Sequence, residues 1–134
     1  MKLIEFYKWY KLKKEIIEWN IKTFPDNQYG SQLLKVGSEL SELNEAFCRE
    51  DIENIKEEAS DVFISTVGLF RFKKENKMFK RYYRTLLKQL RKFSKEEKFD
   101  LYECVKSKME INKMRIFEKT ENNTHQHIEK RTLH

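Results

Sequence analysis

The chain has 134 residues, with 28 Lys and Arg against 22 Asp and Glu and a formal net charge of +6. This length allows one domain with a hydrophobic core and excludes two ordinary domains, while 3 Gly, 1 Pro and 37% charged residues favour a helical chain with few tight turns. Because the sequence has neither a run of about 18 apolar residues nor a signal-peptide pattern, we expect a cytoplasmic protein without a membrane span, in which Cys48 and Cys104 are reduced thiols.

Three helices are predicted in the first half of the chain. Residues 3–23 form an aromatic-rich helix, which ends in "FPDNQYGS" because Pro25 cannot continue a helix. The second helix runs to about Cys48. Its expected core-facing stripe, with steps of three and four, consists of Leu33, Val36, Leu40, Leu43 and Phe47. The third, over residues 52–74, becomes apolar nearly all round, as expected for the centre of a bundle.

Two further helices are predicted in the second half. Residues 78–93 form a basic amphipathic helix, whose expected apolar stripe consists of Phe79, Tyr82, Leu86, Leu90 and Phe93. The last helix covers residues 98–117. No strand-like alternation occurs, so we predict an all-α bundle over residues 1–117. Residues 118–134 are polar and lack periodicity, which predicts a flexible tail.

Charge is spread unevenly along the chain. Residues 39–61 contain nine acids and two bases, whereas residues 71–98 contain twelve bases and three acids. Crowded like charges destabilise a fold unless something of opposite charge joins them. The acidic segment is therefore the first place to look for a binding site.

The acids of this segment form two pairs with the same spacing. Glu39 and Glu42 are three residues apart on the second helix, and Glu58 and Asp61 are three apart on the third. Each acid lies one position beside an expected apolar stripe, so antiparallel packing of the two helices would bring the pairs face to face. Four carboxylates in one partly dry pocket repel unless they are protonated or bridged by a cation.

A cation held only by carboxylates would be a hard one. Oxygen ligands without His or Cys favour Mg²⁺, with Mn²⁺ as an alternative, and carboxylate-bound Mg²⁺ most often serves a phosphate substrate. The competing interpretation is a solvated charged face, because a single E-x-x-E is common in helices this rich in charge. The prediction of a metal site therefore depends on finding two pairs on consecutive helices.

The last helix offers groups that suit phosphate. In "KSKMEINKMR", Lys108, Asn112 and Arg115 fall at i, i+4 and i+7 and share one face. Lys and Arg neutralise phosphate oxygens, and Asn can donate or accept a hydrogen bond. The alternative is an ordinary solvated face, since cations near a helix C-terminus also interact favourably with the helix dipole.

Together these motifs resemble the MazG-like all-α nucleoside triphosphate pyrophosphohydrolases, particularly the small single-domain forms common in phages. The resemblance covers about residues 19–117. Its elements are "WNIKTFP", "KVGSELSEL", "EEASDV" and "KMEINKMR". Relative to that family, the chain carries an extra basic helix before its last core helix, and Ser38 stands where many members have a Glu just before the first acid pair.

The resemblance implies a four-helix-bundle type of fold, assembled as a homodimer or homotetramer. It also implies Mg²⁺-dependent hydrolysis of nucleoside or deoxynucleoside triphosphates to the monophosphate and pyrophosphate. The catalytic and metal-holding residues implied are Glu39, Glu42, Glu58 and Asp61. The residues implied to face the phosphates are Lys108, Asn112 and Arg115, with Lys35 assisting. Trp19, Phe24 or Tyr29 would stack on the base, although aromatic residues at helix ends usually belong to a core.

A second interpretation concerns residues 73–98, where Lys and Arg alternate with aromatic side chains. Basic groups contact phosphates and aromatic rings stack on unpaired bases, so this helix could bind nucleic acid in a protein without catalysis. A basic amphipathic helix also suits a membrane surface, or is simply a bundle helix with a solvated basic face.

Overall fold

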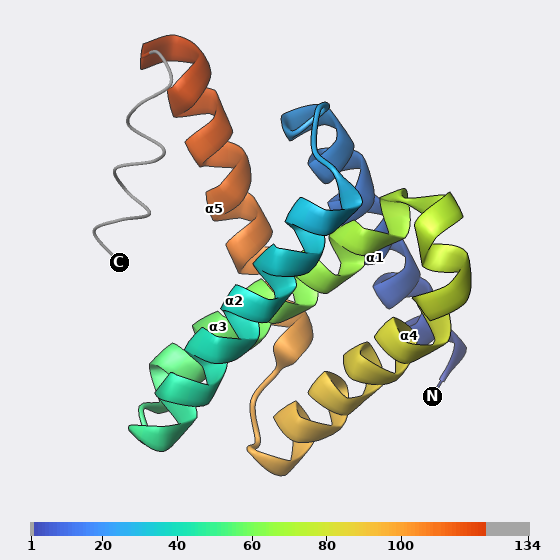
Figure 1. Cartoon of the computed structure of the whole chain (residues 1–134). Helices are drawn as coiled ribbons and strands as arrows, with labels where there is room; N and C mark the ends of the chain where they lie inside the picture. The colour runs from blue at the N-terminus through green and yellow to red at the C-terminus, as the bar shows by residue number, and fades with distance from the viewer. Residues whose placement is uncertain (1, 123–134) are drawn as a thin grey trace.

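The computed structural model describes residues 2–122, and every regular element in that range is helical. The chain folds into five α-helices and one 3₁₀ turn (Figure 1). In chain order these are α1 (Leu3–Thr23), α2 (Tyr29–Cys48), α3 (Ile52–Gly68), η1 (Leu69–Arg71), α4 (Lys73–Glu96) and α5 (Leu101–Asn122). The predicted all-α fold is therefore confirmed for residues 2–122.

Local signals explain where α2 and α3 are joined and where α3 ends. The Asp51 side chain accepts a hydrogen bond from the backbone N–H of Asn54 at 3.2 Å and so caps α3. The predicted third helix was too long, because α3 ends at Gly68 and passes into the 3₁₀ turn η1. Phe72 then leaves helical geometry (φ −92°, ψ 72°) and α4 begins at Lys73, five residues before its expected start.

Helix α3 is the centre of the fold and packs against each of the other four α-helices. In Figure 1, α2 lies alongside α3, while α5 and α4 extend to opposite sides. Most of the largest fully buried apolar side chains come from α3 and its neighbour α5. They include Val62, Phe63, Val67, Val105 and Met109. The burial of most of the second half of α3 agrees with the expectation that this segment forms the centre of a bundle.

The stripe expected for α2 was correct at Val36, which is buried, and in part at Leu43, which packs against the core, but wrong at its other positions. Leu40 and Phe47 are 37% and 52% exposed, and the buried positions are Gln32, Val36, Glu39 and Ala46. A carboxylate thus lies on the seam itself and not beside it. Similarly, α4 buries Tyr83 and Leu87, one residue along from the expected Tyr82 and Leu86. In both helices the apolar pattern was broad enough to allow a neighbouring face.

The last helix is longer than predicted. Helix α5 continues to Asn122, so residues 118–122, expected to begin a tail, extend the last helix. The rest of the expected tail, residues 123–134, lies outside the described residues. Within residues 2–122, none of the helices is both long and apolar enough to cross a bilayer.

Candidate metal centre and its cavity

A cavity of about 620 Å³ opens between α1, α2, α3 and α5. Its walls include all the acids and phosphate-facing residues predicted from the sequence, together with Trp19. These are Trp19, Lys35, Glu39, Glu42, Glu58, Asp61, Lys108, Asn112 and Arg115. Phe24 also lines the cavity, whereas Tyr29 does not and hydrogen bonds instead to the Tyr83 hydroxyl at 2.7 Å. Ser38 is exposed and lies outside the cavity wall.

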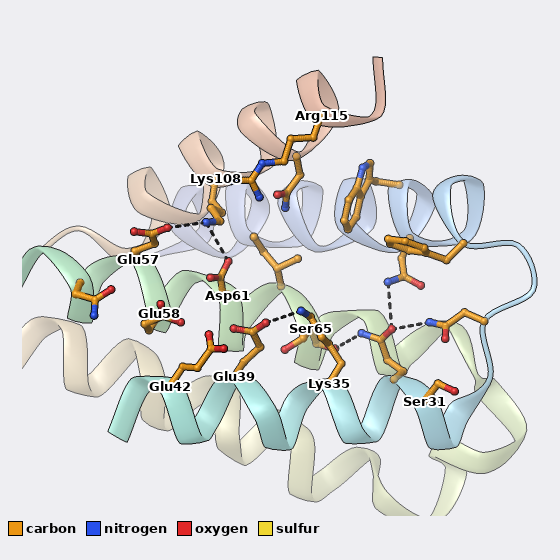
Figure 2. Close-up of a pocket in the computed structure, with 18 of the residues that line it drawn as sticks. Ser31, Lys35, Glu39, Glu42, Glu57, Glu58, Asp61, Ser65, Lys108 and Arg115 are labelled. Atoms are coloured by element: carbon orange, nitrogen blue, oxygen red, sulfur yellow. Dashed lines mark hydrogen bonds and ion pairs between the residues drawn. The ribbon is translucent and has the colours of Figure 1, made fainter. Parts of the chain in front are cut away.

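The two acid pairs face one another across the interface of α2 and α3, as Figure 2 shows. Carboxylate oxygens of Glu39, Glu58 and Asp61 lie within 4.8 Å of one another. The fourth predicted acid, Glu42, is outside this trio, and sharing a proton with Glu42 helps to raise the pKa of Glu58. We call Glu39, Glu58 and Asp61 the carboxylate trio.

Two oxygen atoms of the trio are buried without partners. Glu39 is only 5% exposed, and one of its oxygens pairs with Lys35 Nζ at 2.7 Å. Its second oxygen, Oε2, and Oε2 of Glu58 are buried without a hydrogen-bond donor from the part of the chain described. A buried acceptor without a donor costs roughly 1–3 kcal/mol and more when it is charged, so these atoms favour a ligand that supplies positive charge.

The electrostatics of the trio point the same way. Burial, the hydrogen bond to Glu42 and the charges of nearby acids raise the pKa of Glu58 from 4.5 to about 8. Burial also raises the pKa of Asp61 from 3.8 to about 6, against the lowering effect of Lys108. Without a further cation, the cluster therefore relieves its repulsion by holding protons.

Helix α5 supplies the basic wall opposite the acids. Lys108 Nζ lies 3.0 Å from Glu57 and 3.5 Å from Asp61, and in Figure 2 Arg115 reaches from α5 toward the same space. Asn112 lies between them in sequence and contacts the Met109 sulphur at 3.9 Å. Glu57 was missed by sequence reasoning. The available signal was its spacing, since it precedes Asp61 by one helical turn and so shares its face.

The other end of the cavity is lined by side-chain amides that the sequence did not single out. They belong to Asn20, Asn27 and Gln32, and we call them the amide end. Gln32 donates to the Ser65 carbonyl at 2.8 Å and accepts from Asn27 at 2.7 Å and from Asn20 at 3.4 Å. A signal was present, because Gln32 precedes Glu39 by seven residues, two helical turns on the same face.

The trio fits a hard divalent cation. Its donors are all carboxylate oxygens, which is the ligand type preferred by Mg²⁺ and Mn²⁺. Two of these oxygens are buried without a donor from the residues whose side chains are described. Lys35 and Lys108 neutralise part of the charge from the sides, which leaves the centre of the trio for an ion.

Comparison with known proteins identifies no relative. No family model, curated protein or solved structure matches this chain. The MazG-like resemblance therefore rests on the sequence motifs alone.

Proposed function

We propose that the chain is an Mg²⁺-dependent nucleoside triphosphate pyrophosphohydrolase of the MazG-like type, cleaving substrates to the monophosphate and pyrophosphate. The observation that carries the proposal is the convergence of the carboxylate trio with the basic wall of α5 in one cavity. Acids that hold a metal ion and bases that hold phosphate oxygens are the two parts needed for metal-assisted phosphoryl chemistry.

The proposed roles follow from position. Glu39, Glu58 and Asp61 would hold the ion, with Glu42 alongside. Bound Mg²⁺ would neutralise phosphate charge and lower the pKa of a coordinated water. Lys35 keeps one oxygen of Glu39 oriented through its 2.7 Å ion pair. Lys108, Asn112 and Arg115 line the opposite wall, where they would contact the phosphates.

The reaction needs a proton acceptor near the α-phosphorus. Glu42 lines the cavity, is more exposed than the trio and shares a proton with Glu58. We assign Glu42 this role, in which it accepts the proton of the attacking water while pyrophosphate leaves. Trp19 and Phe24, which lie edge to face with ring centroids 5.7 Å apart, would pack against the base.

Product analysis tests this proposal directly. The protein is incubated with each deoxynucleoside triphosphate and Mg²⁺, and the products are separated by ion exchange. We expect a monophosphate and pyrophosphate in equal amounts. Release of orthophosphate, or no turnover with any canonical nucleotide, would reject the assignment.

The alternative of a nucleic-acid-binding protein draws on α4. Its Lys and Arg side chains are mostly exposed, and Tyr82 and Phe79 are exposed among them. Exposed rings between cations suit unpaired bases. Tight, steeply salt-dependent RNA or DNA binding by a protein that hydrolyses no nucleotide would favour this function.

A homodimer or homotetramer also remains a proposal, supported by apolar side chains at the surface. The first turns of α1 expose Leu3, Ile4, Phe6, Tyr7 and Tyr10. An apolar groove between α2 and α4 is lined by Leu40, Phe47, Leu86 and Phe93 among others. Contiguous apolar surface often marks a protein interface. Sedimentation equilibrium would determine the oligomeric state.

A further inference from the structure

The orientation of each amide at the amide end is determined by its neighbours. The Ser65 carbonyl can only accept, so the group of Gln32 that approaches it at 2.8 Å is the N–H. The Gln32 oxygen must then face Asn20 and Asn27, which both donate to it. At the opposite end of the chain of bonds, the Arg71 guanidinium can only donate, and it approaches the side-chain oxygen of Asn20 at 2.9 Å.

Each of the three amide oxygens consequently accepts at least one hydrogen bond. Asn20 Oδ1 accepts from Arg71, Gln32 Oε1 accepts from two amides, and Asn27 Oδ1 accepts from the backbone N–H of Gln28 at 3.0 Å. Each amide nitrogen carries two hydrogens and uses one within this network. The amides therefore retain three N–H donors, one on each nitrogen, whereas acceptor capacity is left only as one lone pair each on the Asn20 and Asn27 oxygens.

A further donor lies nearby. The indole Nε1–H of Trp19, which also lines the cavity, is buried and has no acceptor among residues 2–122. The Ser65 hydroxyl donates to the Val62 carbonyl of its own helix at 3.2 Å. A ligand group that reaches this end would meet donors and would be favoured if it carried acceptors.

The amide end lies within reach of a nucleotide bound at the trio. Gln32 and Glu39 are seven residues apart on one face of α2, which corresponds to about 10 Å along the helix. This span suits a nucleotide whose phosphates are at the acids and whose base points toward Gln32. Trp19 and Phe24 border the same end and supply apolar surface for the base.

We infer that the amide end selects nucleobases that present a carbonyl oxygen, such as hypoxanthine, guanine, uracil or thymine, over adenine, which has none. The inference rests on the proposed function for the position of the phosphates. Arg71 acts as a positioning residue, because it holds Asn20 and the end of α1 through the carbonyls of Asn20 and Phe24 at 3.1 and 2.8 Å.

A matched pair of purine substrates tests this inference. Deoxyinosine and deoxyadenosine triphosphates have the same ring system. Hypoxanthine has a carbonyl oxygen at C6 and a hydrogen on N1, whereas adenine has an amino group at C6 and an unprotonated N1. We expect kcat/KM for deoxyinosine triphosphate to be about ten- to a hundredfold higher, because the C6 amino group of adenine would place a donor against the N–H donors of the amide end, where hypoxanthine places an acceptor. Calorimetric binding of the two corresponding monophosphates should show the same order without turnover.

Two variants assign the preference to the amides. Asn27→Asp replaces a donor with an acceptor, and Asn27→Ala removes the donor without adding charge. Either should reduce the preference to within about threefold. Asn44→Asp makes the same chemical change at an exposed residue of α2 outside the cavity and should keep the preference. Arg71→Lys should lower the base preference more than it lowers kcat for deoxyinosine triphosphate, and melting curves establish that each variant is folded.

The outcomes separate this inference from the proposed function. Equal hydrolysis of both triphosphates, or a preference for the adenine nucleotide, overturns the inference. Either result is still consistent with the proposed pyrophosphohydrolase function. A preference that survives in both Asn27 variants also overturns it. Selective binding of the inosine monophosphate by a protein that hydrolyses no triphosphate supports the inference and rejects the function. Absence of both binding and hydrolysis rejects both.

Discussion

Both ends of the cavity are lined by polar side chains that lie inside a helical bundle. At the amide end, Asn20, Asn27 and Gln32 hydrogen bond to one another, to a backbone carbonyl and to Arg71. At the acidic end, Glu39 and Glu58 each keep a buried oxygen without a donor from the described residues. The hydrogen bonds of the amide end are thus largely made within the fold, whereas the buried carboxylates of the acidic end require a ligand that supplies positive charge.

The amide end therefore acts as a rigid structural network, and the acidic end as the proposed reactive site. A satisfied buried network makes a fold specific and rigid. An unsatisfied cluster of like charges destabilises the fold, so its presence is explained best by a ligand that offsets the cost. Four predictions test this difference between the amide end and the acidic end, beginning with the largest expected effect.

Removing one charge from the trio should abolish most activity. We expect Asp61→Asn to lower kcat/KM by at least about a hundredfold, because the ion loses a ligand and the phosphates lose its charge. The Mg²⁺-induced rise in melting temperature should disappear as well. Glu53→Gln neutralises an exposed acid of the same helix and serves as the control. A fully active Asp61→Asn protein would disprove the metal site.

The amide end should be sensitive to added volume. A Cβ on Gly68 would lie 2.6 Å from Gln32 Nε2 and 2.9 Å from Asn20 Nδ2, so both amides would have to move. We expect Gly68→Ala to lower the free energy of unfolding by about 1–3 kcal/mol, measured by urea denaturation. Gly37→Ala, where nothing lies within 4 Å of the new Cβ, should stabilise the protein by about 0.5–1 kcal/mol. Equal effects at the two glycines would show that the network is not a rigid frame.

The metal-free protein should lose stability as the pH rises. Since the folded-state pKa of Glu58 is raised from 4.5 to about 8, its proton stabilises the folded form below about pH 4.5, and this contribution is lost as the pH rises through about 8. Glu58→Gln should flatten the dependence of unfolding free energy on pH over that range. Added Mg²⁺ should stabilise the wild-type protein more at pH 8 than at pH 6, because ions bind ionised carboxylates. An unchanged pH profile in the variant would show that Glu58 is ionised without metal.

The smallest effect is expected from α4. Replacing the exposed Lys80 and Lys88 with Gln should change kcat/KM by less than about twofold at physiological salt, because distant surface charges are screened. Activity should be measured at low salt too, where loss of attraction for anionic substrates would be larger. A tenfold loss at physiological salt would place α4 in the functional site and favour the nucleic-acid interpretation.

Much of the fold was predictable because it depends on local signals. Pro25 marked the end of the first helix, which the structure confirms, and the start of α3 depends on the local cap of Asp51. In the second half of α3 the apolar residues were so numerous that nearly every side of the helix was expected to be buried. Where the apolar pattern was broad, as in α2 and α4, the buried face was displaced from the predicted one. The rotation of such a helix is set by its neighbours, which periodicity alone does not specify.

For the cavity, the sequence by itself determined which acids could meet, since Glu39, Glu42, Glu58 and Asp61 recur at one-turn spacing on consecutive helices. Only the tertiary structure decided that Glu39 is buried while Leu40 is partly exposed, and that Gln32, Asn20 and Arg71 join across as many as 51 residues. The physical reason is that local spacing defines a helix face. Which face is buried, and which polar groups are satisfied there, depends on distant partners that pack against it.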